Sequence, residues 1–334
     1  MRSTSAGPPR MQDVAAAAGV SMITVSRALS EPAKLAPATR ARVQAAIDLL
    51  HYVPNLTAGS LASRRSRIVA AIVPTLANSI FSDTVDGLAQ ALVEGGYQLL
   101  LGQSRYREAE EAALVDAFLG RRVDGLVLTG VRHARGVRAR LQRAGVPVVE
   151  TWDLAARPID MVVGFSNRRA GEAAARYLAG KGYGRLAFVG GEDDRSRERL
   201  EGFQAGARAC KAGRVAVDAV PSSSSLADGS AAMGRLLRLS PPVGAVLCVN
   251  DMLAAGALFE CRRRAVPVPA RMAVMGFADL PIAAAIEPGL TSIQVRSEAM
   301  GQHAGALLLQ RLRGGSRTAR IVDLGFAVVE RASA

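Results

Sequence analysis

A short segment near the start of the chain carries residue types that contact the bases of duplex DNA. Ser21 is a favourable first cap for a helix, and Met22, Ile23 and Arg27 fall on one side of that helix. Arginine makes paired hydrogen bonds to guanine, and apolar side chains contact the methyl group of thymine. We therefore expect this segment to read base edges. The candidate residues are Ser21, Met22, Ile23, Thr24, Ser26 and Arg27.

Two helices separated by a tight turn must position these side chains. Val14 and Ala18 recur at helical spacing and give the first helix a small apolar face. Gly19 supplies the left-handed residue that ends a helix at low cost. Val25 and Leu29 are expected to face inward from the second helix. This order predicts a helix-turn-helix, whose second helix enters the major groove.

A third helix completes the predicted domain. It begins at Pro37, which is acceptable as a first helical residue, and buries Val43, Ala46, Ile47 and Leu50. The pattern alone also fits a small helical bundle without a ligand.

Charge favours the DNA-binding alternative. Residues 1–67 hold nine basic and three acidic side chains, nearly half of the net charge of +13 in a fifth of the length. Basic charge concentrated beside such a motif is the electrostatic footprint of phosphate binding.

The motifs of this region resemble the DNA-binding domain of the lactose/galactose repressor family. The signature is specific because it covers about fifteen positions within some fifty residues. The resemblance extends over essentially the whole chain and implies a core like a periplasmic sugar-binding protein. The motifs are Asp13-Val-Ala, Ala18-Gly-Val-Ser21, Thr24-Val-Ser-Arg27, Thr39-Arg40 and Tyr52-Val-Pro-Asn55.

The same resemblance implies a hinge helix and a ligand class. Leu61-Ala62 looks like the leucine and alanine of the family's hinge, so Asn55, Ala58 and Leu61 are expected to contact operator DNA. Three further segments look like the gluconate-repressor branch. They are Val163-Gly-Phe165 with Asn167, Phe259-Glu-Cys261 and Asp323-Leu-Gly-Phe326.

The remainder of the chain predicts an α/β fold on independent grounds. Apolar runs of four to eight residues alternate with helical segments of about a dozen, which is typical of doubly wound parallel sheets. About 265 such residues exceed one usual core, so we expect two lobes. The runs include Ile68–Val73, Gln98–Gly102, Gly125–Thr129, Val146–Glu150, Leu186–Gly190, Ala245–Val249 and Ala273–Gly276. The expected domains are 1–53 (helix-turn-helix), 54–66 (hinge and linker) and 67–334 (core), with lobe 1 at about 67–165 and 296–322 and lobe 2 at about 166–295 and 323–334.

Ligands of such folds bind beyond the carboxyl ends of the strands, here between the lobes. Arg199 offers a planar fork for a carboxylate, or else forms a surface ion pair with Glu201 or Asp194. Asn250 and Asp251 offer mixed donors and acceptors, although Asp251 could instead cap the following helix. Ile80, Phe81, Arg199, Asn250 and Asp251 resemble the ligand contacts of the family. The full expected effector set is Ile80, Phe81, Glu150, Trp152, Arg195, Arg199, Asn250, Asp251 and Asp279.

One departure from the family pattern bears on the ligand. Many members carry an aspartate directly after a Val-x-Gly-aromatic element, where it can bind sugar hydroxyls. Here Met275-Gly-Phe277 is followed by Ala278, and the carboxylate comes one residue later at Asp279. Fewer carboxylates at the ligand reduce repulsion of an anion, which favours a sugar acid such as gluconate or its 6-phosphate.

Other classes find little support. The sequence contains no GxGxxG, GxxxxGK[ST] or GxSxG motif, and His51, His133 and His303 lie in three unrelated segments. We expect no enzyme activity, no cofactor and no metal. The three cysteines show no metal-ligand spacing, and no apolar run is long enough to span a bilayer. We therefore expect a cytoplasmic protein without a membrane partner.

These observations predict a homodimeric transcriptional repressor that binds a pseudo-palindromic double-stranded operator and is controlled by a small ligand between two lobes. An alternative within the class is a repressor or activator that responds to another sugar, a phosphosugar or a purine. An alternative of another class is a nucleoid-type DNA-binding module with a vestigial ligand core.

Overall fold

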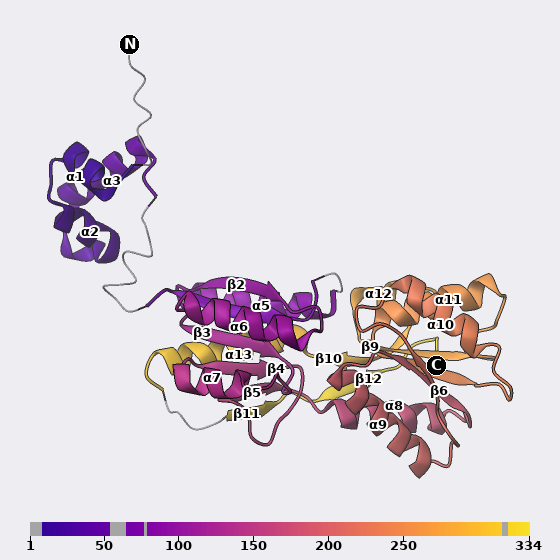
Figure 1. Ribbon diagram of the computed structural model, residues 1–334. Helices are drawn as coiled ribbons and strands as arrows, with labels where there is room; N and C mark the ends of the chain where they lie inside the picture. Colours follow the sequence, from indigo (N-terminus) through magenta and orange to yellow (C-terminus); the bar gives the residue numbers. More distant parts are fainter. Residues whose placement is uncertain (1–8, 54–64, 77–78, 316–319) are drawn as a thin grey trace. The chain divides into compact units, whose positions relative to one another are not determined.

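The computed structural model divides the chain into two compact units, residues 1–66 and 67–334 (Figure 1). The hinge candidates Asn55, Ala58 and Leu61 lie outside the described residues, so their predicted role stays a prediction. The described residues are 9–53, 65–76, 79–315 and 320–334.

The first unit contains the predicted helix-turn-helix: α1 (Met11–Ala18), α2 (Met22–Ser30) and α3 (Pro37–Leu50), with a short 3-10 turn at Pro32–Lys34. Gly19 has φ of 62°, the left-handed conformation that the turn requires. The Ser21 hydroxyl accepts a hydrogen bond from the Thr24 amide at 3.2 Å and so caps α2.

A small apolar cluster holds these three helices together. Val14, Val25 and Val43 are almost completely buried, and Ile47 and Leu50 pack against them, as predicted. Leu29 was predicted to face inward, and this is wrong.

Leu29 is 37% exposed because Ala28, at the i+3 position from Val25, takes the place against the cluster. The second helix therefore packs against the cluster through Val25 and Ala28, without the contribution of Leu29 that the sequence pattern predicts.

The second unit consists of two six-stranded sheets with helices. Lobe 1 is built around the sheet ordered β11-β5-β4-β3-β1-β2, and lobe 2 around the sheet ordered β12-β10-β9-β8-β6-β7. Strand pairs are parallel except β10 with β12. The strands of lobe 1 are β1 (Ile68–Val73), β2 (Gln98–Gln103), β3 (Gly125–Thr129), β4 (Val148–Thr151), β5 (Met161–Gly164) and β11 (Arg320–Asp323). Those of lobe 2 are β6 (Leu186–Gly190), β7 (Ala216–Ala219), β8 (Ala245–Cys248), β9 (Ala273–Ala278), β10 (Thr291–Val295) and β12 (Phe326–Val329).

Helices cover both faces of each sheet (Figure 1). The helical segments of lobe 1 are η2 (Ser79–Phe81), α5 (Ser82–Glu94), α6 (Glu108–Gly120), α7 (Val137–Ala144) and α13 (Ser297–Leu312). Those of lobe 2 are α8 (Asn167–Gly180), α9 (Asp194–Ala209), α10 (Leu226–Leu236), α11 (Asp251–Arg263) and α12 (Pro281–Ala285). The predicted fold class, a helix-turn-helix domain followed by a two-lobed core of doubly wound sheets, is confirmed.

Alternate residues of β1 show how one strand supports two layers. Val69 and Ala71 belong to the core beneath α5 and α13, whereas Ala70 and Ile72 belong to the cluster beneath α6 and α7. Successive side chains of a strand point to opposite faces, so a continuous apolar run serves both layers. This explains why buried runs without polar alternation form the central strands.

The chain passes between the lobes three times within the described residues. The crossings follow β5, β10 and β11. β11 ends at Asp323, so the last crossing falls one residue later than the expected boundary. The described helices of the chain include none with the length and apolar composition needed to cross a membrane.

Glycines let helix pairs approach closely in both lobes. A Cβ on Gly202 of α9 would overlap the backbone carbonyl of Arg168 in α8, and one on Gly171 of α8 would overlap the carbonyl of Arg199. Gly301 of α13 makes the same kind of approach to Thr84 of α5. The position of α9, which carries two of the predicted effector residues, therefore requires that Gly171 and Gly202 have no side chain.

We expect Gly202→Ala to lower the free energy of unfolding of the core by about 1–3 kcal/mol, because the added methyl group meets backbone that cannot rotate away. Gly180→Ala is the matched control: Gly180 ends α8, and nothing lies within 4 Å of the place that its Cβ would take. That change should leave stability unchanged or raise it slightly. Urea unfolding of both variants measures this, and equal stability would contradict the packing argument.

Candidate effector cleft and DNA-reading helix

The exposed side of α2 carries the predicted base-reading residues. Met22 is 54% exposed and Ile23 71% exposed, and Arg27 is also exposed. Thr24 is partly buried, and its amide and hydroxyl both contact Ser21 in the cap. Met22, Ile23 and Arg27 are therefore presented to a partner, whereas Thr24 mainly fixes the start of the helix.

A cleft lies between the two lobes of the core. Its outer part has a volume of about 340 Å³, and its inner part, of about 30 Å³, shares Tyr106, Asp193, Arg195 and Ser222 with the outer part. Six of the nine predicted effector residues line the inner part. They are Ile80, Phe81, Trp152, Arg195, Arg199 and Asn250.

Aromatic rings from lobe 1 form one wall. Phe81 meets Trp152 edge to face with ring centroids 5.0 Å apart. The Trp152 indole nitrogen donates a hydrogen bond to the Thr84 hydroxyl at 3.1 Å, which fixes the ring. Phe165 also meets Trp152 edge to face, with ring centroids 6.1 Å apart. The wall is therefore rigid and apolar.

Arg199 lies at the floor of the cleft and is 4% exposed. Its Nε donates to the Asn167 side-chain oxygen at 2.8 Å, and Nη1 donates to the Val249 carbonyl at 3.0 Å. The guanidinium also sits over the Phe277 ring, 3.7 Å from the centroid. Burial lowers the pKa of Arg199 to about 10, so the side chain stays charged at neutral pH.

The alternative of a surface ion pair for Arg199 is wrong. Glu201 pairs with Arg168, and Asp194 pairs with Arg197 and Arg132. Each carboxylate that the sequence offered to Arg199 thus has another partner, and Arg199 itself is buried.

Arg195 reaches from the first turn of α9 towards the rings of lobe 1. Its guanidinium carbon lies 5.3 Å from the Phe81 centroid and 5.9 Å from the Tyr106 centroid. Asp193 lies 3.8 Å from Nη2, beyond ordinary hydrogen-bond distance. A largely buried cation with one loose carboxylate partner suits an incoming anion.

Asn250, rather than Asp251, caps α11. The Asn250 side-chain oxygen accepts from the Leu253 amide at 2.8 Å. The amide nitrogen has one long contact, 3.5 Å, to the Ser224 hydroxyl. Asn250 lines the inner cleft, and a nitrogen with only this long contact can donate to a ligand hydroxyl.

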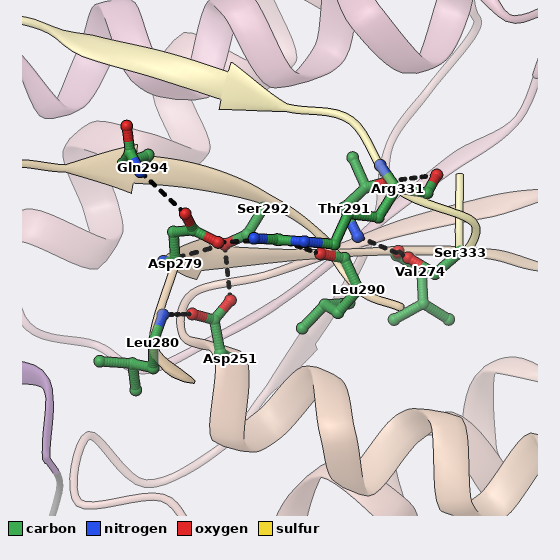
Figure 2. A network of polar contacts seen from close by, with 10 residues as sticks. All are labelled: Asp251, Val274, Asp279, Leu280, Leu290, Thr291, Ser292, Gln294, Arg331 and Ser333. Carbon is green, nitrogen blue, oxygen red and sulfur yellow. Dashed lines mark hydrogen bonds and ion pairs between the residues drawn. The ribbon is translucent and has the colours of Figure 1, made fainter. Parts of the chain in front are cut away.

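Three predicted effector residues point elsewhere, and their positions correct the prediction that they face a ligand. Asp251 accepts from the Ser292 hydroxyl and the Leu280 amide, both at 2.6 Å (Figure 2). Burial raises the pKa of Asp251 to about 7. Asp279 pairs with Arg331 at 2.7 Å, and its other oxygen accepts from Gln294 (Figure 2).

The third residue, Glu150, is fully buried inside lobe 1. Its Oε1 lies 3.1 Å from His133 Nε2, and Oε2 accepts from the Ile159 amide at 2.6 Å. The other His133 nitrogen lies 2.9 Å from Glu111. Burial opposes a charged His133, but the two carboxylates outweigh it and raise the pKa of His133 to about 9.

His133 gives a pH dependence with a defined sign. Its pKa in the folded protein, about 9, exceeds the ordinary value of 6.5, so the folded state binds the proton more tightly. The stabilisation is complete below pH 6.5 and is lost as the pH rises to 9. We expect the free energy of unfolding to fall by about 3 kcal/mol across this window.

His133→Gln is the variant for this measurement, because it keeps a hydrogen-bonding side chain that does not titrate. Urea unfolding at several pH values should show a smaller slope between pH 6.5 and 9 than in the wild type. Parallel slopes in the two proteins would refute the assignment.

The sequence did not single out three side chains that line both parts of the cleft: Tyr106, Asp193 and Ser222. Tyr106 follows the end of β2 by three residues, and Asp193 follows the end of β6 by three. Their position just beyond the carboxyl ends of strands was the available signal. Asp153, which also lines the outer part, has a pKa raised by burial.

Comparisons with known proteins agree with both units. The family model described as bacterial regulatory proteins, lacI family, matches residues 10–55, and that of the periplasmic binding protein-like domain matches residues 175–334. The HTH-type transcriptional regulator GntR of Pseudomonas aeruginosa is 38% identical over 98% of this chain and 96% of its own length.

Solved structures show the same similarity. A lacI family transcriptional regulator from Silicibacter pomeroyi superposes with a TM-score of 0.90 at 32% identity, covering 98% of this chain and 99% of that one. The transcription regulator GntR from Chromobacterium violaceum gives 0.76 at 36% identity, covering 80% of this chain and 98% of that one.

A helix-turn-helix unit followed by a two-lobed α/β core defines a class of bacterial DNA-binding transcriptional regulators. The chain belongs to the lacI family of these regulatory proteins.

Proposed function

We propose that this regulator is a homodimeric repressor whose operator affinity is controlled by a sugar acid of the gluconate type bound between the lobes. Arg195 and Arg199 carry this proposal, because two largely buried guanidinium groups line the inner cleft. A buried cation is costly unless an anion compensates it. Asp193 is the single carboxylate among the described residues of the inner cleft, and it lies 3.8 Å from Arg195.

The remaining polar groups suit the hydroxyls of such a ligand. The Asn250 amide nitrogen can donate from lobe 2, and Asp153 at the outer part can accept from lobe 1. The relatives named GntR support the same ligand class. A repressor acting on operator DNA works in the cytoplasm, where we place this protein.

The control follows from linkage between two binding sites. When the ligand and the operator favour different arrangements of the lobes, each weakens the binding of the other by the same factor. A two-fold dimer also reads both halves of a pseudo-palindrome, which a single helix-turn-helix cannot do.

Arg195→Gln tests the ligand proposal. It removes the charge with little loss of volume, and the ion pair of Arg195 with Asp193 is loose, whereas Arg199 holds two hydrogen bonds of the fold. Gluconate affinity, measured by calorimetry, should fall by about 2–5 kcal/mol, while operator affinity without ligand stays nearly unchanged. Arg208→Gln is the matched control, since Arg208 lies on the same helix but is exposed and lines neither part of the cleft.

Titration of operator-bound protein completes the experiment. Gluconate or 6-phosphogluconate should shift operator affinity of the wild type and of Arg208→Gln, but not of Arg195→Gln. A response to neutral sugars or purines alone would refute the sugar-acid proposal but would not contradict the repressor function. No response to any ligand would favour a DNA-binding module with a vestigial core.

Arg27→Ala tests base reading by α2. If Arg27 contacts a guanine, the change should cost roughly 1–3 kcal/mol on the cognate half-site and relax specificity at one base pair. Affinities for cognate and random duplexes are compared at one salt concentration. Equal losses on both duplexes would show that Arg27 contacts phosphate instead. Arg42→Ala is the control, since Arg42 is an exposed basic residue of α3 outside the motifs above, and it should leave the preference for the cognate duplex unchanged.

A further inference from the structure

Tyr106 of lobe 1 lies beside Arg195, a cation that lobe 2 contributes to the cleft. It lies between β2 and α6 and lines both the inner and the outer part. The Arg195 guanidinium, from α9 of lobe 2, sits against the rings of Tyr106 and Phe81, both of lobe 1. An anion bound to Arg195 would therefore lie beside the Tyr106 side chain.

The composition of the inner cleft makes Tyr106 distinctive. Among the described residues that line it, lobe 1 contributes Ile80, Phe81, Trp152 and Tyr106. The first two side chains are apolar, and the Trp152 N–H is already bonded to Thr84. The Tyr106 hydroxyl is therefore the polar group that lobe 1 can offer to a ligand at this point.

The backbone holds Tyr106 in an unusual conformation. Arg105 has φ of 53° and Tyr106 has φ of 59°, so two consecutive residues with side chains adopt the left-handed region. This region is unfavourable for residues that carry a Cβ, because the Cβ comes close to the following carbonyl oxygen. Two backbone hydrogen bonds fix the turn: Ser104 N–H to Val73 at 3.0 Å and Arg107 N–H to Ser104 at 2.9 Å. Strain of this kind concentrates at binding sites.

The ionisation of Tyr106 suits a donor role. Burial raises the pKa of Tyr106 above its ordinary value, although the charge of Arg195 opposes this. The phenol therefore keeps its proton at neutral pH and can donate it to an oxyanion.

We propose that the Tyr106 hydroxyl donates a hydrogen bond to the carboxylate of the effector held by Arg195, so that both lobes grip the same anionic group. The proposal rests on the sugar-acid function above and adds a residue that selects acids over neutral polyols. It also gives the carboxylate a bond to each lobe, which links binding of the anion to closure of the cleft.

Tyr106→Phe removes the hydroxyl and keeps the ring, so the wall of the cleft persists. Calorimetry with gluconate should show affinity about ten- to a hundredfold weaker than in the wild type, as expected for a hydrogen bond to a charged group. Glucitol, the neutral polyol of the same carbon chain, should bind the two proteins equally. Tyr97→Phe is the matched control, because Tyr97 is a buried tyrosine of lobe 1 that does not line the cleft.

A double-mutant cycle adds a second readout. With Arg195→Gln present, Tyr106→Phe should cost much less than in the wild type, because the anion is no longer held beside the ring. Unchanged gluconate affinity in Tyr106→Phe, or equal losses for gluconate and glucitol, would overturn the assignment of Tyr106 while leaving the sugar-acid function intact. A wild type that binds no sugar acid would overturn both.

Discussion

The cleft depends on the burial of the Arg199 guanidinium. A buried cation is unfavourable unless its donors are satisfied, and here Asn167, Val249 and the face of Phe277 surround it. These partners belong to α8, the end of β8 and β9, so one side chain joins three elements of lobe 2. Gly171 lies directly against the Arg199 carbonyl, and any side chain at position 171 would push α9 away. The close packing of α8 against α9 therefore also fixes the position of Arg199.

Aromatic rings extend that constraint into lobe 1. Phe277 lies 5.9 Å from Phe165, Phe165 lies 6.1 Å from Trp152, and Trp152 lies 5.0 Å from Phe81. The series passes from the floor of the cleft in lobe 2 to its wall in lobe 1. Aromatic contacts thus link the floor of the cleft to its wall, and the charged residues that line the inner part are Arg195, Arg199 and Asp193. Two arginines against one carboxylate at this end of the cleft support the proposal of an anionic ligand group.

Sequence reasoning succeeded where local pattern decides the structure. Central strands such as β1 and β6 were predicted because both of their faces are buried, which leaves long apolar runs. Five strands were not among the expected runs: β7, β11 and β12 are four-residue edge strands that are only partly buried, whereas β5 and β10 are buried strands of four and five residues. Glu150 and Asp251 were misjudged for a different reason. In the sequence, a carboxylate at or just after a strand end has the same pattern whether it contacts a ligand or another residue of the protein. The partners of these two carboxylates, His133 and Ser292, are brought to them only by the fold.

Asp279 shows most clearly what the fold adds to the sequence. Ala278 and Asp279 both have positive φ, 103° and 58°, so the chain turns sharply after β9. The turn brings Asp279 to Arg331, which is 52 residues away in sequence. The carboxylate is thereby neutralised by the protein and does not line the cleft, whereas Arg195 and Arg199 do. A neutral sugar would lose an acceptor for its hydroxyls from this change, but an anion loses a source of repulsion. The pairing of Asp279 with Arg331 and the presence of Arg195 and Arg199 in the cleft thus both favour an anionic ligand over a neutral one.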